Sequence, residues 1–375
     1  MNNGSWRRLR ALIGKEFLQI LRDPSSIIIA LVLPLVLLFA FGYALSLDAT
    51  GVKIGLVLED TSPAAQGFAA ALTHSRYFNV RSGHDRRRFD NDLLAGDIAG
   101  MVVVPGDFSE RLARSGDSAP IQILTDASQP NTASFVENYV RGAWQVWQQQ
   151  RARDQGRELQ LPVQLQPRFW FNTELDSHFF LVPGSVAIVM TLIGAILTAL
   201  VVSREWERGT MEAMMATPIS IHELLLGKLV PYYVLGMGSM FLTLFVSVQI
   251  FHVPFRGTFG VLCLVATVFL MAALGLGLLI STLARNQFVA AQVALLSAFL
   301  PSFLLSGFIF EIASMPWPIR LLTHIISARY FVSSLQTLFL AGDIWSELVP
   351  DMLAMLAIAA VLFTITARRT VKRLD

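Results

Sequence analysis

The chain has 375 residues, of which 54% are hydrophobic and only 15% charged, whereas soluble proteins carry about 25% charged residues. This composition excludes most soluble folds and indicates a membrane protein. The formal net charge of +2 is too small to suggest a nucleic acid as partner. The single cysteine, Cys263, excludes an intrachain disulfide and a cysteine-based metal cluster.

Six stretches are long and apolar enough to cross a bilayer as helices, which takes about 20 residues each. Their centres carry no charged residue, and a charge at the bilayer centre costs about 2.5 to 3.5 kcal/mol on insertion scales. The stretches are residues 25–47, 179–202, 229–251, 257–283, 288–310 and 347–367. We therefore predict an α-helical polytopic membrane protein with six transmembrane helices.

The distribution of lysine and arginine predicts the orientation, because basic short segments stay on the cytoplasmic side. The two ends and the segments after the second and fourth spans together contain 13 lysine and arginine residues, whereas the two opposing short segments contain only Arg256, Arg320 and Arg329. Both termini, including the tail 368–375, are therefore expected in the cytoplasm. The long loop 48–178 is expected on the external side.

This long loop alternates short apolar strands with helical stretches, a pattern typical of an α/β domain. Asp60, Thr61, Ser62 and Pro63 form a typical helix entry. The predicted strands are 52–58, 77–80, 98–104, 121–124 and 163–171, and the predicted helices are 64–72, 86–94, 107–114 and 132–153. We predict an α/β domain inserted between the first two spans, and no sequence motif marks a ligand pocket in it.

No motif supplies the chain with its own energy source or catalytic centre. Gly14–Lys15 and Gly227–Lys228 are followed by Glu16 and Leu229, so neither belongs to a P-loop. The sequence contains no H-E-x-x-H and no G-x-S-x-G. We therefore predict that the chain is not an enzyme and binds no cofactor or metal of its own.

A charged segment begins where the second span ends and is the most informative part of the sequence. In this segment, residues 203–228, hereafter the elbow, Arg204 and Arg208 are spaced as helical neighbours, Gly209 permits a bend and Pro218 a stop. Such an elbow could insert into a groove of a partner protein. A solvated loop that anchors two helices at the lipid headgroups is an equally good interpretation of the pattern.

The order of residues in the elbow resembles one family. The sequence R-E-W-E-R-G-T-M-E from Arg204, with Thr217–Pro218 after it, resembles the loop after the second span of ABC-2 type exporter permeases. Further landmarks agree over essentially the whole chain: Lys15-Glu16-Phe17 through Arg22-Asp23-Pro24, Trp170-Phe171-Asn172 with Val182-Pro183-Gly184, Leu305-Ser306-Gly307-Phe308 with Met315-Pro316, and Arg329-Tyr330-Phe331-Val332. Ser327 departs from the pattern, in which many relatives have proline, and this departure affects only the expected local bend.

The resemblance implies a permease subunit of an ATP-driven exporter in a bacterial inner membrane. Its expected partners are a cytoplasmic ABC ATPase that binds ATP and Mg, a second ABC-2 permease, identical or homologous, and a periplasmic adaptor protein. The apolar spans suit a hydrophobic or amphipathic cargo, drug-like or lipid-like. The elbow would contain the coupling helix that contacts the ATPase through Arg204, Glu205, Glu207, Arg208, Gly209, Thr210 and Glu212.

The same resemblance suggests that the second and fifth spans form the pathway or the dimer interface. Small residues on the second span suit a close approach of helices. The candidates are Gly194 and Thr198 on the second span and Gln292, Leu296, Phe299, Phe303 and Ser306 on the fifth. An aromatic stripe of this kind is also consistent with a surface that faces lipid or packs against another helix.

Two further segments have more than one interpretation. In residues 1–24, a stripe of Trp6, Leu9, Ile13, Phe17 and Ile20 at helical spacing predicts an amphipathic entry helix, either a second partner surface or a helix on the membrane surface. Residues 311–335 are too interrupted to span and too apolar for a free loop. We predict a re-entrant hairpin on the external side, which caps the exit or packs under the external domain.

Two other functional classes fit the composition less well. A stand-alone ion-coupled carrier or cation antiporter usually has charged residues at mid-membrane depth, where these spans offer only amides and hydroxyls. A membrane-anchored sensor needs a cytoplasmic output domain, and the predicted cytoplasmic segments are short. The exporter permease is therefore the favoured hypothesis.

Overall fold

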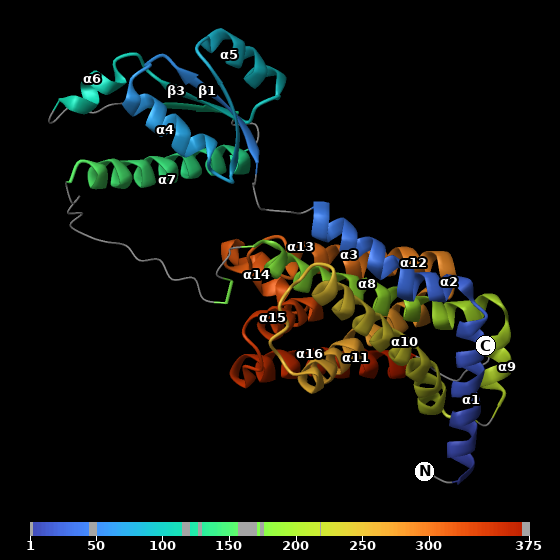
Figure 1. The fold of residues 1–375 in the computed structure, drawn as a ribbon. Helices are drawn as coiled ribbons and strands as arrows, with labels where there is room; N and C mark the ends of the chain where they lie inside the picture. Colours follow the sequence, from blue (N-terminus) through green and yellow to red (C-terminus); the bar gives the residue numbers. More distant parts are fainter. Residues whose placement is uncertain are drawn as a thin grey trace. The chain divides into compact units, whose positions relative to one another are not determined.

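The computed structural model describes residues 3–44, 51–114, 121–126, 130–156, 171–172, 176–217 and 219–369. They belong to two compact units, which Figure 1 shows as a helical unit and a unit with a sheet. The helical unit comprises Met1–Ser46 and Arg168–Asp375, and the other unit comprises Leu47–Pro167. The second unit is inserted in the sequence of the first, as predicted.

Six helical stretches of the first unit are long and apolar enough to cross a membrane, which confirms the predicted number. The first is α2 (Pro24–Ile27), a π-helical turn (Ile28–Val32) and α3 (Leu33–Ala44), and the fifth is α12 (Gln287–Ala294), a π-helical turn (Leu295–Phe299) and α13 (Leu300–Leu305). The others are α8 (His178–Glu207), α10 (Ile221–Gln249), α11 (Phe259–Ala284) and α16 (Trp345–Arg369). Helix α8 continues five residues beyond the predicted end of the second span.

Helix α8 is the centre of this unit and packs most closely on α11. A Cβ added to Gly194 would lie 2.8 Å from the Cβ of Ala273, and one added to Gly277 would lie 2.1 Å from Oγ1 of Thr198. The backbone N–H groups of Val202 and Ser203 both lie 2.9 Å from Oγ of Ser281. Small side chains therefore let the two backbones approach, as is common between membrane helices.

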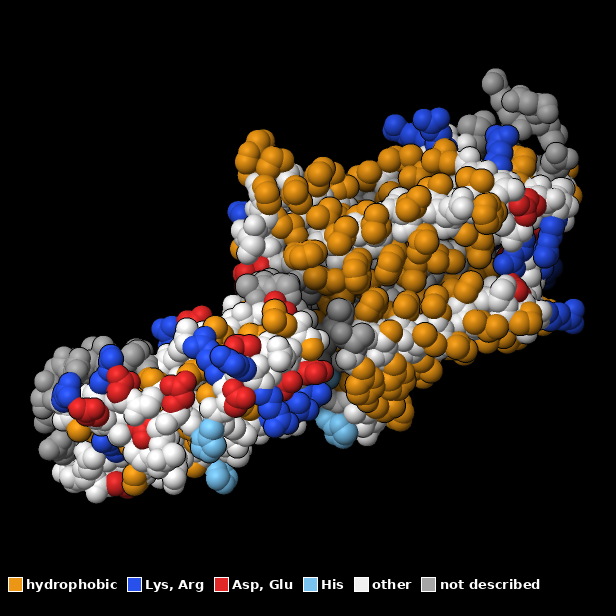
Figure 2. All heavy atoms as spheres, turned by 90° about the horizontal axis from the view of Figure 1, so that it is seen from above, with side chains coloured by type: hydrophobic (Ala, Val, Ile, Leu, Met, Phe, Trp, Pro, Cys, Tyr) orange, Lys and Arg blue, Asp and Glu red, His pale blue; other side chains and the backbone are white. Residues whose placement is uncertain are grey.

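The outer helices of the unit present a large apolar surface. Leu296 of the fifth stretch is 63% exposed and Leu353 of α16 is 61% exposed. Figure 2 shows one face of the unit covered by hydrophobic side chains, with lysine and arginine at its edges. Such a surface is far larger than soluble proteins tolerate and is suited to lipid.

Helix α1 (Asn3–Leu21) packs on α10, where a Cβ added to Gly227 would lie 2.9 Å from the Cβ of Leu12. Leu9 and Ile20 are buried as the stripe predicts, but Trp6 is 62% exposed. The buried face of α1 is therefore rotated from the predicted one and includes a charged residue, Glu16.

Two short helices follow the fifth stretch in the predicted hairpin segment. A 3-10 turn (Ile312–Ser314) leads to α14 (Trp317–Thr323), in which Trp317 is 73% exposed, and then to α15 (Ser327–Leu340). Helix α15 is buried in the unit, where the ring of Phe331 stacks on Phe269 at 3.8 Å. The segment contains two bends, and α15 extends five residues beyond the predicted end.

The second unit is an α/β domain, as predicted. Its sheet has the order β2 (Phe78–Gly83), β1 (Val52–Leu58), β3 (Gly100–Val104) and β4 (Gln122–Thr125), with β1 parallel to β2 and β3, and β3 antiparallel to β4. Its helices are α4 (Pro63–Thr73), α5 (Arg86–Ala95), α6 (Phe108–Ala113) and α7 (Pro130–Asp154). The predicted strand 163–171 lies outside the described residues except for Phe171.

The two faces of this sheet have separate cores. On one face, Ile54 and Val102 pack with Phe68 of α4 and Trp147 of α7, and on the other Val103 packs with Phe89 of α5. Ser62 caps α4 by accepting the N–H of Ala65 at 3.2 Å, as the predicted helix entry requires. Helices on both faces of a largely parallel sheet bury its central strands.

Candidate functional site

The elbow is an extension of α8, followed by a sharp turn. Helix α8 ends at Glu207, Arg208 and Gly209 form the turn, and α9 (Thr210–Met215) follows. Gly209 has a φ of +67°, which residues with a side chain rarely adopt. The bend predicted at Gly209 is therefore present, and it depends on this glycine.

Two of the elbow residues that the resemblance assigns to the contact with an ATPase are buried in this chain. The Arg204 guanidinium lies 2.7 Å from the carboxylate of Asp23, and the Glu205 carboxylate lies 3.0 Å from Lys15 and 3.1 Å from Lys228. Arg204 is 7% and Glu205 4% exposed. Both side chains therefore form ion pairs within the chain.

The remaining predicted contact residues are placed differently. Glu207, Arg208, Gly209 and Thr210 are exposed at the end of α8 and the start of α9. Glu212 lies in α9, but its side chain is outside the part of the chain that the structure describes. The turn between α8 and α9 is thus exposed, and it carries the charged side chains of Glu207 and Arg208.

A buried ion pair joins the last residue of the elbow, Lys228, to Glu16 of α1, and it was not predicted from the sequence. The ammonium of Lys228 lies 2.9 Å from the carboxylate of Glu16, and the two residues are 2% and 1% exposed. Buried charges are tolerated only when they are paired. Together with Glu205, these two residues connect α1, α8 and α10. The sequence offered one sign that Glu16 is buried, since it falls on the same helical face as Leu9 and Ile20.

Asp23 connects the start of the first span to the end of α8 through its ion pair with Arg204. Its carboxylate accepts hydrogen bonds from the hydroxyls of Ser25 and Ser26 and from the guanidinium of Arg204, besides one from the backbone N–H of Ser25. Partial burial works to raise the pKa of Asp23, but these hydrogen bonds outweigh it and lower the pKa to about 2. Asp23 therefore remains a carboxylate at any physiological pH.

The elbow also contacts the start of the fifth span. The Glu207 carboxylate accepts the backbone N–H of Gln287 at 3.0 Å and the side-chain amide of the same residue. The guanidinium of Arg285 lies 4.7 Å above the ring of Trp206. A carboxylate at a helix N-terminus is favourable, so the end of α8 and the start of α12 are held together.

The residues predicted for the pathway or dimer interface fall into two groups. Gly194 and Thr198 are buried against α11 of the same chain, so their close approach is to the fourth span and they do not reach the surface of this chain. On the fifth span, Gln292 and Leu296 are exposed, Phe299 and Phe303 are half-buried, and Ser306 is buried. Of these seven residues, Gln292 and Leu296 are the ones exposed in this chain.

Two of the landmark motifs meet in space. A Cβ added to Gly184 would lie 2.5 Å from the ring of Phe308, which is fully buried. The ring of Phe308 also lies 5.9 Å from Phe41 and 6.0 Å from Phe303. The return into α8 and the exit from the fifth span therefore pack against each other.

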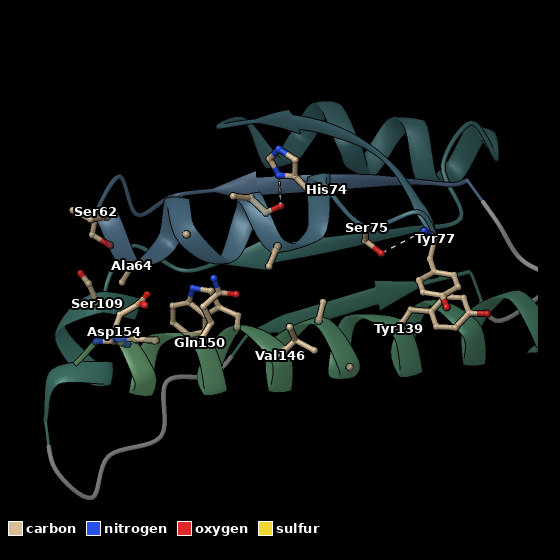
Figure 3. Close-up of a pocket in the computed structure, with 18 of the residues that line it drawn as sticks. Ser62, Ala64, His74, Ser75, Tyr77, Ser109, Tyr139, Val146, Gln150 and Asp154 are labelled. Carbon is tan, nitrogen blue, oxygen red and sulfur yellow. Dashed lines mark hydrogen bonds between the residues drawn. The ribbon is translucent and has the colours of Figure 1, made fainter. Parts of the chain in front are cut away.

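The second unit contains a groove that the sequence did not reveal. It has a volume of about 1200 Å³ and lies between α4 and α7. In Figure 3, Ala64 and Val146 line it, Tyr77 and Tyr139 stand at one end with ring centroids 4.4 Å apart, and Gln150 and Asp154 lie at the other. Small residues facing each other on two predicted helices were the available signal.

Among the described residues, no group of His, Cys, Asp or Glu is arranged to hold a metal.

Several known proteins are similar to this chain over most of its length. The family model described as "ABC-2 family transporter protein" matches residues 24–368. The "Probable multidrug ABC transporter permease YbhS" of Escherichia coli is 53% identical over 371 residues, 99% of this chain and 98% of that protein.

Two more distant relatives from the same organism also match. The "Probable multidrug ABC transporter permease YbhR" is 28% identical over 92% of this chain and 94% of its own length, and the "Inner membrane transport permease YhhJ" is 28% identical over 75% of each. The family model covers most of the chain, including all six candidate spans almost entirely. The chain therefore belongs to the ABC-2 family of transporter proteins.

Proposed function

We propose that this chain is the membrane-spanning permease subunit of an ATP-driven exporter in a bacterial inner membrane. The observation that carries the proposal is 53% identity over nearly the whole length to YbhS, whose name describes a multidrug ABC transporter permease. The cargo we propose is hydrophobic or amphipathic, because the exposed fifth-span surface around Leu296 and Phe299 is apolar. ATP hydrolysis belongs to a partner ATPase subunit.

The permease works with a second permease. The similarity to YbhR, which is named as a permease like YbhS, supports a homologous second chain, and an identical one is the alternative. The fifth span, with Leu296 and Gln292 exposed, is the proposed interface. The α/β domain, outside the cell membrane in this proposal, would receive a periplasmic adaptor.

The exposed turn of the elbow is the proposed contact with the ATPase. Glu207 and Arg208 present opposite charges there, and Glu207 also binds the first residue of α12. A movement of the turn when the ATPase closes its nucleotide sites would therefore be passed to the second and fifth spans together. The buried ion pairs of Glu205 and Lys228 make the end of α8 move as one piece with α1 and α10.

The experiment is a double charge reversal, Glu207→Lys with Arg208→Glu, in the reconstituted complex. Breaking a charged hydrogen-bonded pair at an interface costs about 2 to 5 kcal/mol, so we expect loss of ATPase stimulation by the permease and loss of export by cells. The matched control is Arg86→Glu with Asp90→Lys, an exposed pair in the other unit. Full export and unchanged ATPase stimulation in the elbow variant would contradict the proposed coupling.

Purification in mild detergent tests the assembly itself. We expect an ABC ATPase and a second permease to copurify with the chain. A chain that purifies alone and transports ions in liposomes without ATP would instead support the ion-coupled carrier.

A further inference from the structure

A basic recess lies where α1 and the start of the first span meet the end of α8. Its volume is about 570 Å³, and its polar lining consists of Lys15, Gln19, Arg22, Asp23, Arg204 and Arg208. Four cations and one carboxylate therefore face a single space. A recess of this charge is suited to an anion.

Two of the four cations already have partners. Arg204 is paired with Asp23 at 2.7 Å, and Lys15 with Glu205 at 3.0 Å. Arg22 and Arg208 are exposed and make no ion pair with any residue of the described ranges. Two guanidinium groups on the same recess are thus left for a ligand, and guanidinium groups bind phosphate oxygens in a bidentate way.

The surroundings of the recess are apolar. Leu18 lines it and is 57% exposed, while Leu21 and Ile28 nearby in the sequence are 69% and 54% exposed. The first candidate span begins at Pro24, directly after Arg22 and Asp23 of the recess, so the recess adjoins the end of that candidate span. A ligand in the recess therefore meets the cations and the exposed side chain of Leu18.

We propose that this recess binds the phosphate group of an anionic membrane phospholipid. Arg22 and Arg208 hold the phosphate oxygens, Gln19 offers an amide donor, and the acyl chains lie along Leu18, Leu21 and Ile28. The exposed apolar side chains favour a lipid over an acidic loop of a partner protein, because acyl chains can cover them and an acidic loop cannot. Basic pockets beside transmembrane helices bind lipid headgroups by the same chemistry.

The test measures binding of phosphatidylglycerol to the purified full chain by native mass spectrometry, with phosphatidylcholine as the neutral comparison. The variants are Arg22→Gln, Arg208→Gln and, as the matched control, Arg10→Gln, which removes the same charge from an exposed position of α1 outside the recess. A basic residue near an anionic lipid surface contributes about 1 kcal/mol. We therefore expect about fivefold weaker phosphatidylglycerol binding in the first two variants and unchanged binding in Arg10→Gln.

Three results would overturn the proposal. If Arg22→Gln and Arg10→Gln weaken phosphatidylglycerol binding equally, the lipid is attracted by the overall positive charge of the protein and not by the recess. Displacement of phosphatidylglycerol by millimolar inorganic phosphate would identify a site for a free anion. Unchanged lipid binding in Arg22→Gln together with weaker binding of the ATPase would assign the recess to the protein partner. The thermal unfolding of Arg22→Gln in neutral lipid serves as a check of folding, and it should match the wild type because Arg22 is exposed.

Discussion

The ammonium of Lys228 lies 2.9 Å from the carboxylate of Glu16, although 212 residues separate them in the sequence. The same ammonium lies 3.1 Å from Glu205 at the end of the second span. One buried lysine therefore holds the N-terminal helix, the second span and the third span in register beside the elbow. This relationship makes the stability of the helical unit sensitive to a single charge.

Lys228→Met should destabilise the chain strongly. It leaves Glu16 and Glu205 buried without their common cation, and breaking a buried pair by removing one partner costs about 3 to 5 kcal/mol. The measurement is thermal unfolding in detergent. Lys15→Met is the control, because Lys15 contacts the same two carboxylates but its side chain is 47% exposed; an exposed pair contributes about 0 to 1 kcal/mol. Equal effects would show that burial of Lys228 is not the cause.

Gly277→Val should loosen the contact between α8 and α11. Its Cβ would lie 2.1 Å from Oγ1 of Thr198 and 2.3 Å from the carbonyl oxygen of Ala195, and overpacking of a tight contact costs about 1 to 3 kcal/mol. We expect a lower unfolding temperature and less folded protein in membranes. Gly238→Val, on α10 with nothing within 4 Å of an added Cβ, should behave as the wild type.

Gly209→Val should impair coupling without affecting insertion. A β-branched residue opposes the φ of +67° at this turn, and a residue forced into such a conformation costs about 1 to 3 kcal/mol. We expect reduced ATPase stimulation and reduced export at normal membrane levels. Gly209→Asn should retain more activity, because asparagine tolerates a positive φ. Equal activity of the two variants would contradict a role for the turn.

The proposed orientation can be tested with cysteines introduced one at a time after Cys263 is replaced by alanine. Positions 126 and 153 should be labelled in intact spheroplasts by an impermeant thiol reagent, and positions 208 and 372 only after lysis. The reason is the excess of basic residues in the segments assigned to the cytoplasm. Labelling of position 208 but not of position 126 in intact spheroplasts would show the opposite orientation.

The α/β unit, residues 47–167, should fold when expressed alone, because it has a hydrophobic core on each face of its sheet. Circular dichroism and cooperative thermal unfolding are the measurements. Its removal from the whole chain should spare insertion and impair export. Full export by a deletion with a short linker would show that the unit is dispensable.

Asp60 should make that unit less stable in acid. Burial works to raise the pKa of Asp60, but the backbone N–H groups of Ser62 and Ser109, at 2.7 and 2.8 Å, outweigh it and hold the pKa below 3.8. Because the folded pKa is depressed, the stabilisation is present above about pH 4 and is lost as the pH falls through the folded value. Asp60→Asn should reduce stability at pH 7 by about 1.5 to 3 kcal/mol and flatten this acid dependence, whereas Asp90→Asn, at an exposed site, should do neither.

The sequence by itself determined the six spans and most elements of the α/β unit. Long apolar runs without central charges are incompatible with a soluble fold, so the number of spans can be counted from the sequence without knowledge of tertiary contacts. The helix entry at Ser62 and the turn at Gly209 are also local, since one cap or one glycine decides each. The elbow motif was sufficient to identify the family that the comparisons established.

Only the tertiary structure decided which side chains are available to a partner. Arg204 and Glu205 are found beside Glu207 and Arg208 in the sequence, yet the first two are buried in ion pairs and the last two are exposed. Gly194 and Thr198 suit a close helix approach, but the sequence does not state that the approaching helix is α11 of the same chain. In each case the partner is distant in sequence, and local periodicity gives the face of a helix without giving what packs against it.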